Sequence, residues 1–138
     1  MLPVTALYAG LSGIWLVLLS LAVIRLRWRH RVSLGDGGVA ELERACRAHG
    51  NAVETVPIVL IMLALAESLG TPAPLLHLFG LGLVVGRVLH GAYFFVDRPG
   101  LGLRQAGMGL TFLVMGALAI GLIAHSLAVL LTGGNGAA

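Results

Sequence analysis

Residues 41–55 decide the fold, and they read Glu41-Leu42-Glu43-Arg44-Ala45-Cys46-Arg47-Ala48-His49-Gly50-Asn51-Ala52-Val53-Glu54-Thr55. The stretch places five charged side chains directly before an apolar run. Successive residues advance about 100° around a helix, so four polar side chains fall within an arc of about 80°. These four are Arg44, Arg47, Asn51 and Glu54. They share one narrow helical face, which we expect to face protein rather than lipid.

The apolar run after this face is too short to cross a membrane by itself. It covers residues 55–66, about a dozen residues, whereas a spanning helix needs about 20. The hydrocarbon region must therefore begin near Arg47 and include Asn51 and Glu54. Ionisable groups at such depth are costly and by default indicate a functional site. The structural alternative is an ion pair, such as Arg47 with Glu54, that locks two helices together.

The composition places the chain among integral membrane proteins. Of its 138 residues, 58% are hydrophobic and only 11% are charged, with a mean hydropathy of +0.97. All nine basic residues are arginine, and four of them lie within residues 25–31, just beyond an apolar segment. This cluster predicts topology and lipid-headgroup anchoring, and we expect no nucleic-acid partner. The single cysteine, Cys46, excludes an intramolecular disulfide and a cysteine-based zinc site.

Four apolar segments predict an all-α, four-transmembrane-helix bundle. We expect the helices at about residues 2–24, 39–69, 73–96 and 103–131, and we treat residues 1–138 as one membrane domain. Residues 25–38 are expected to form a loop because the basic run is followed by a glycine-rich turn. Pro57 is expected to kink the second helix. A cleaved signal peptide competes for the first segment, but the positive cluster follows the apolar run instead of preceding it.

The distribution of arginine predicts the topology. Residues 67–74 contain an acid and no arginine, so the positive-inside rule places them opposite the cluster at residues 25–31. We expect both termini outside and the first and third loops in the cytoplasm. The third segment carries Gly82-Leu83-Val84-Val85-Gly86, a spacing that lets helix backbones approach closely. By itself this spacing is a weak dimerisation signal.

The predicted topology brings polar residues of three helices to one depth, just inside the cytoplasmic face. The expected cavity is lined by Arg47, Asn51, Glu54, Arg87, His90 and Arg104, with Tyr93 on the same side. Three guanidiniums, one carboxylate, an amide and an imidazole suit a small zwitterionic ligand with more carboxylates than amines. Glutathione has that charge pattern. No close helical spacing of ligands supports a metal site, and we expect none.

The motif Arg47-Ala48-His49-Gly50-Asn51-Ala52-Val53-Glu54, with Arg87-Val88-Leu89-His90 and Arg104 after it, resembles the MAPEG family. This family comprises membrane-associated proteins of eicosanoid and glutathione metabolism, including microsomal glutathione transferases. The resemblance covers residues 41–109 through motifs and the whole chain through length and four-span layout. It implies a homotrimer of four-helix protomers in a bacterial inner membrane. Glutathione would bind between neighbouring subunits near the cytoplasmic face.

The resemblance also assigns roles to individual residues. Arg47, Asn51 and Glu54 match the family's glutathione-holding positions, and Arg87 and His90 match the polar positions of the third helix. Arg104 looks like the arginine that faces the glutathione sulfur. The chain departs from the family at two places. Phe94 stands where the family has tyrosine, with Tyr93 displaced by one residue, and the loop before Arg104 is longer, which leaves Arg98 as a possible substitute.

The expected activity is that of a membrane-bound glutathione transferase or peroxidase. Arginine is no base at neutral pH, so Arg104 would stabilise the glutathione thiolate, which attacks a lipophilic electrophile or hydroperoxide in a detoxification reaction. One alternative is a catalytically silent MAPEG-like protein that binds glutathione or lipid. The other is a small multidrug transporter. A transporter needs a carboxylate in its pathway, but the first helix has none, and we expect Glu54 to be buried among arginines.

Overall fold

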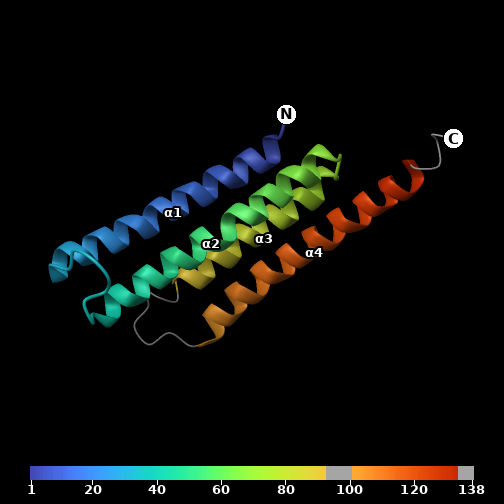
Figure 1. Cartoon of the computed structure of the whole chain (residues 1–138). Coiled ribbons are helices and arrows are strands. Elements are labelled where there is room, and N and C mark those ends of the chain that lie inside the picture. Colours follow the sequence, from blue (N-terminus) through green and yellow to red (C-terminus); the bar gives the residue numbers. More distant parts are fainter. Residues whose placement is uncertain (93–100, 134–138) are drawn as a thin grey trace.

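The computed structural model of the chain describes residues 1–92 and 101–133 and folds them into four long helices without a strand (Figure 1). These are α1 (Pro3–His30), α2 (Ala40–Ser68), α3 (Ala73–Ala92) and α4 (Leu101–Gly133). Each helix is long and apolar enough to cross a membrane. The expected fold class, an all-α integral membrane bundle of four helices, is confirmed.

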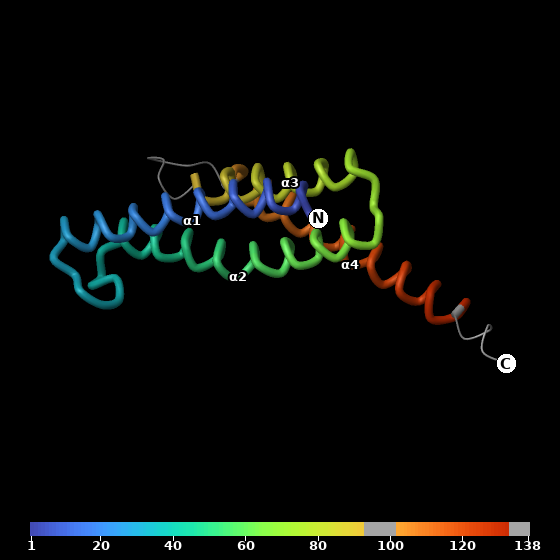
Figure 2. The backbone as a smooth tube through the Cα atoms, turned by 90° about the horizontal axis from the view of Figure 1, so that it is seen from above, coloured from blue at the N-terminus to red at the C-terminus, as the bar shows by residue number. Residues whose placement is uncertain are grey.

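The helices lie side by side in two closely packed pairs. α1 packs mainly on α2 and α3 mainly on α4, and α2 joins the pairs through contacts with both α3 and α4. Figures 1 and 2 show α1 and α2 extending past α3 at one end of the bundle, while α4 projects past the others at the opposite end. Large apolar side chains such as Ile14, Leu113 and Ile120 are exposed. Such exposure is expected where hydrocarbon, not water, surrounds the helices.

The main core lies between the helices toward the end that carries the N-terminus. Its most buried members are Val59, Leu63, Leu76 and Leu83, which α2 and α3 contribute. A smaller cluster around Leu26, Leu42 and Ala45 joins the far end of α1 to the start of α2. This second cluster continues the bundle beyond the apolar segments and supports the end where the polar residues gather.

The first helix is longer than the sequence indicated. α1 ends at His30, whereas the apolar run ends at Ile24, so the prediction of a loop over residues 25–38 was wrong for its first six residues. Arginine is a good helix former, and basic side chains near a helix C-terminus interact favourably with the helix dipole. The helix closes at Arg31 (φ 55°), where the Val32 N–H donates to the Arg27 carbonyl at 3.0 Å. The end of the apolar run therefore marks the edge of the hydrocarbon region, and the helix ends six residues later.

The other bounds follow the expectations closely. α2 continues through Pro57, whose ring is exposed, to Ser68, and a kink at this residue stays a prediction. α3 begins at Ala73 as expected, and residues 93–96 of its predicted range lie outside the described part of the chain. α4 is two residues longer at each end than the predicted 103–131.

At the end of the bundle away from residues 31–39, polar contacts join three helices. The Glu67 carboxylate accepts the backbone N–H groups of Val4 at 3.0 Å and Thr5 at 2.7 Å. The Tyr8 hydroxyl donates to the His77 carbonyl at 3.1 Å. The first N–H groups of a helix have no partner within it, so Glu67 caps α1 from a neighbouring helix.

Candidate functional site

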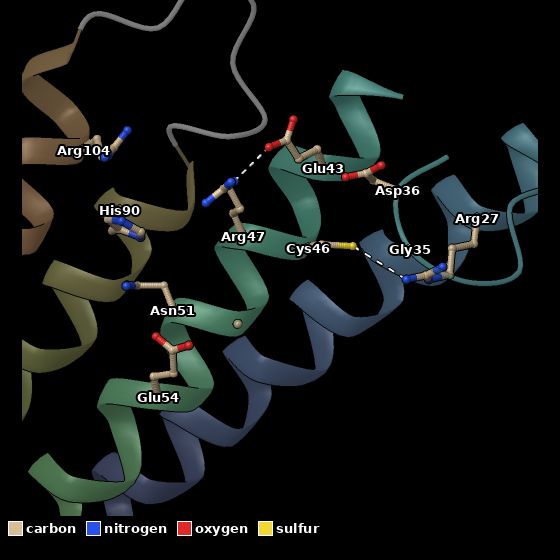
Figure 3. Close-up of a pocket in the computed structure, with 11 residues that line it drawn as sticks. Arg27, Gly35, Asp36, Glu43, Cys46, Arg47, Asn51, Glu54, His90 and Arg104 are labelled. Carbon is tan, nitrogen blue, oxygen red and sulfur yellow. Dashed lines mark hydrogen bonds and ion pairs between the residues drawn. The ribbon is translucent and has the colours of Figure 1, made fainter. Parts of the chain in front are cut away.

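A cavity of about 710 Å³ lies at the end of the bundle where α1 and α2 project past α3 (Figure 3). Five of the predicted site residues line it, and they are Arg47, Asn51, Glu54, His90 and Arg104. Three helices contribute them: α2, α3 and α4. The structure therefore brings together most of the residues that the sequence grouped, at one end of the molecule.

Arg47 and Glu54 line the cavity with exposed side chains, so the protomer leaves this side of the cavity open. The Arg47 side chain is 72% exposed, and its Nε donates to Glu43 Oε1 at 3.0 Å. Glu54 is also exposed, so its predicted burial among arginines is wrong for the single protomer. The alternative of a structural ion pair between Arg47 and Glu54 is also not realised, because Arg47 pairs with Glu43. Both predicted residues present charge at the cavity surface.

Asn51 is half-buried one helical turn below Arg47. Its Oδ1 atom is buried and accepts no hydrogen bond from the part of the chain that the structure describes. A buried acceptor without a donor is unfavourable, because it has lost its hydration without replacement. In Figure 3 the Asn51 side chain extends toward the side of the cavity where His90 lies.

Arg87 does not line the cavity, which corrects the expectation that all six polar residues share one wall. Its side chain is only 2% exposed, and Nη1 donates to Thr55 Oγ1 at 2.7 Å. Thr55 Oγ1 in turn donates to the Asn51 carbonyl at 2.8 Å. Within residues 1–92 and 101–133, Arg87 forms no ion pair with a carboxylate, and its Nε has no hydrogen-bond partner. Arg87 therefore joins α3 to α2 behind Asn51.

His90 and Arg104 form the α3 and α4 side of the cavity. His90 is 4% exposed, whereas Arg104, in the first turn of α4, is exposed. Figure 3 shows the two side chains close to each other, across the cavity from Arg27 and Cys46. Tyr93, which completed the predicted site, and Arg98 lie outside the described residues.

Several lining residues were not predicted. They are Arg27, Gly35, Asp36, Glu43, Cys46 and Gly50. Arg27 was interpreted as a topology signal, yet its guanidinium donates to the Ser33 carbonyl at 3.2 Å and to Cys46 Sγ at 3.8 Å. The sequence predicted a loop from residue 25 onward, so it assigned Arg27 to no helical face. The sequence could have predicted that Glu43 lies beside Arg47, because a glutamate four residues before an arginine forms a favourable helical pair.

These additions change the charge of the site. The lining residues include three arginines (Arg27, Arg47 and Arg104) and three acids (Asp36, Glu43 and Glu54). The sequence had predicted an excess of guanidiniums over one carboxylate. The cavity is suited to a small ligand that carries both signs of charge and several amide groups. Among the residues that the structure describes, no three His, Cys, Asp or Glu side chains group as metal ligands would.

A four-helix membrane bundle with a charged cavity at one end defines the class of protein to which the chain belongs. Residues 5–124 match the model of the MAPEG family, and the chain is a member of that family. It is therefore a membrane protein of the glutathione and eicosanoid metabolism family. The resemblance inferred from the motif of residues 47–54 is confirmed.

Two relatives from Escherichia coli carry the name inner membrane protein YecN. The protein of strain K12 is 40% identical over 109 residues, which cover 79% of this chain and 82% of the relative. The protein of strain O6:H1 gives the same values. The relatives' name states a location and no reaction. Together with the four spans, the comparison shows that the chain is a multi-pass integral membrane protein.

Proposed function

We propose that the chain is a membrane-bound glutathione transferase with peroxidase-like capacity, and that its cavity binds glutathione. One observation carries the proposal: the cavity gathers Arg47, Asn51 and Glu54 from α2, His90 from α3 and Arg104 from α4. Its volume of about 710 Å³ lies within the roughly 300–1,000 Å³ typical of small-molecule sites. Family membership supports a ligand from glutathione metabolism.

Several polar groups of the cavity fit groups of glutathione. Glutathione carries two carboxylates, one ammonium group, two amides and a thiol. The Arg47 guanidinium is exposed at the cavity and suits a carboxylate, while the exposed Glu54 carboxylate suits the ammonium group. The Asn51 side-chain amide, which lines the cavity, suits an amide group of the ligand. The α2 face therefore holds the peptide part of the ligand.

The thiol is assigned to the side of the cavity formed by α3 and α4. A thiol with an ordinary pKa of about 8.5 is only about 3% ionised at pH 7. Lowering that pKa by about two units requires about 2.7 kcal/mol of preferential stabilisation of the thiolate. The Arg104 guanidinium is always charged and donates up to five N–H groups. Arg104 is therefore the group that stabilises the thiolate, with His90 beside it.

The second substrate is a lipophilic electrophile or hydroperoxide dissolved in the bilayer. Exposed apolar side chains cover the outer faces of α1 and α4, so such a molecule reaches the bundle through lipid. With an electrophile, the thiolate sulfur forms a bond to the electrophilic carbon, and the leaving group departs with the bonding electrons. With a hydroperoxide, the thiolate attacks the terminal oxygen, the O–O bond breaks and the alcohol leaves; a second glutathione then converts the resulting sulfenic acid to the disulfide and releases water. Arg104 stabilises the reactive form of the nucleophile and does not itself exchange a proton.

We also propose that the protein assembles as a homotrimer, as the family resemblance implies. Glu54 and Arg47 are exposed in the protomer although both adjoin the apolar part of α2. Charged side chains at this depth are unfavourable against lipid. A neighbouring subunit that covers this face would remove them from hydrocarbon and close the open side of the cavity.

The test is a glutathione titration of the detergent-purified protein with 1-chloro-2,4-dinitrobenzene as electrophile. We expect saturable binding, an ultraviolet thiolate absorbance and turnover of the electrophile. Binding without a thiolate signal and without turnover would instead support a silent glutathione-binding protein. Absence of glutathione binding would contradict the proposal altogether.

A further inference from the structure

α3 and α4 touch through their backbones at the level of the cavity. A Cβ atom built on Gly107 of α4 would lie 2.5 Å from the His90 nitrogen and 2.7 Å from the Gly86 carbonyl oxygen. A Cβ atom built on Gly86 of α3 would lie 2.7 Å from Thr111 Oγ1 and 3.0 Å from the Gly107 carbonyl oxygen. Backbone atoms cannot rotate away as a side chain does. The two helices approach this closely only because both positions are glycine.

Thr111 of α4 lies at the same contact. The Thr111 hydroxyl is fully buried and donates to the Gly107 carbonyl at 2.8 Å. Gly82, one turn away on α3, also faces α4, but its Cβ would meet only side-chain ends, Val114 Cγ2 at 2.8 Å and Leu110 Cδ1 at 3.8 Å. The small-residue spacing in α3, interpreted from the sequence as a weak dimerisation signal, is thus used within the protomer.

The two glycines lie one turn from the residues assigned to the thiol. His90 follows Gly86 by four residues, and Arg104 precedes Gly107 by three, so each pair shares a helical face. The backbone of His90 itself contacts Gly107. Any change in the separation of α3 and α4 at these glycines is therefore transmitted to the spacing between His90 and Arg104.

We propose that Gly86 and Gly107 are positioning residues, whose contact sets the spacing between His90 and Arg104 and so presents the Arg104 guanidinium to the glutathione thiol. The inference rests on the function proposed above. The groups assigned to the peptide part of glutathione are all on α2. Displacement of α4 from α3 thus affects thiolate formation more than binding. A displacement of about 1 Å costs about 100-fold in rate where reacting groups must be held in register.

The experiment compares Gly107→Ala with Gly109→Ala in the full-length protein. The two positions lie two residues apart in α4 and gain the same helix propensity, but a Cβ at Gly109 meets nothing within 4 Å. We expect Gly107→Ala to lower turnover about 100-fold and abolish the thiolate absorbance, with a glutathione dissociation constant changed by less than about threefold. Gly109→Ala should match the unmutated protein in all three measurements.

A double-mutant cycle separates positioning from general damage. If Gly107 acts through Arg104, the variant with both Arg104→Ala and Gly107→Ala should turn over no more slowly than Arg104→Ala alone. Additive losses, or a dissociation constant that rises in parallel with the loss of turnover, would overturn the proposal. Should Gly107→Ala not fold, Gly86→Ala takes its place in the same cycle, because its Cβ would lie 3.0 Å from the nearest backbone atom, compared with 2.5 Å at Gly107.

A second readout does not depend on catalysis. Cys46 is the single cysteine, so a Cys46→Ser chain accepts spin labels at two introduced cysteines. Val88→Cys and Gln105→Cys are suitable because both positions are exposed and adjoin His90 and Arg104. The distance between labels should increase in the Gly107→Ala background and not with Gly109→Ala, and an unchanged distance would overturn the proposal. If the unmutated protein forms no thiolate, the proposed function fails, and the label distance still decides whether the glycines set the spacing.

Discussion

The charged residues at the cavity differ in how exposed their side chains are, and this difference indicates different roles. Arg47 and Glu54 are exposed, Arg104 is exposed at the start of α4, and Arg87 is buried behind the wall. An exposed guanidinium at a cavity is available to a ligand. The buried guanidinium of Arg87, which donates to Thr55, instead joins α3 to α2. Residues of the same type therefore have different expected mutational effects.

The first prediction concerns the division between binding and thiolate stabilisation. Arg104→Ala should retain glutathione binding but lose the thiolate absorbance and turnover, about 100-fold for about 2.7 kcal/mol of lost stabilisation. Arg47→Ala should chiefly raise the glutathione dissociation constant. Arg98→Ala is measured beside it, because Arg98 is the possible substitute for Arg104. An intact thiolate signal and intact turnover in both Arg104→Ala and Arg98→Ala would rule out the arginine mechanism.

The second prediction concerns the buried Arg87. Thr55→Val removes the oxygen that accepts from Arg87 Nη1 at 2.7 Å, and a hydrogen bond to a charged group is worth about 1.5–3 kcal/mol. We expect a lower melting temperature in detergent for Thr55→Val and recovery in Thr55→Ser, which keeps a hydroxyl. Equal melting temperatures for both variants would show that the Arg87 bond contributes little.

At the scale of the elements, the ends of the helices carry the specific interactions. Glu67 at the end of α2 caps the first turn of α1, and the start of α2 forms the cavity floor with Arg47 and Asn51. The middle parts are mostly apolar, with polar contacts between helices such as Arg87 with Thr55 and Ser20 with His49. The end contacts therefore fix how the helices are aligned along their axes.

The third prediction tests the cap on α1. Glu67→Ala leaves the Val4 and Thr5 N–H groups without their acceptor, so hydrogen exchange of these two amides should accelerate about tenfold. Glu41→Ala is the control, because Glu41 pairs with Arg29 and His30 at the surface, where ion pairs contribute little. Equal exchange rates in the two variants would mean that the cap does not hold α1.

At the scale of the whole molecule, the protein is an apolar bundle with a polar cavity at one end. The described part of the arginine-rich sequence lies at that end, in the terminal turns of α1 and the first turns of α2 and α4. Basic residues remain on the cytoplasmic side of a membrane because their translocation is unfavourable. We therefore expect the cavity on the cytoplasmic side, which is where the proposed function needs it.

The fourth prediction tests this orientation. Reporters fused after Arg31 and after Arg98 should be cytoplasmic, and a reporter fused after Thr71 should be external. The reverse pattern would place the cavity outside the cell, away from the glutathione of the cytoplasm, and would contradict the proposed function.

The sequence alone determined the class of protein, the number of spans and the group of polar positions on α2, because hydrophobic length and helical periodicity are local properties of the chain. It also located His90 and Arg104 near Asn51, since the spans alternate in direction. Only the tertiary structure placed Arg27 on the cavity wall and Arg87 behind it. Those placements depend on how far α1 continues past its apolar run and on the rotation of α3 against α2. The rotation of α3 is set by contacts between helices, such as Gly86 with Gly107 or Arg87 with Thr55, which no local pattern encodes.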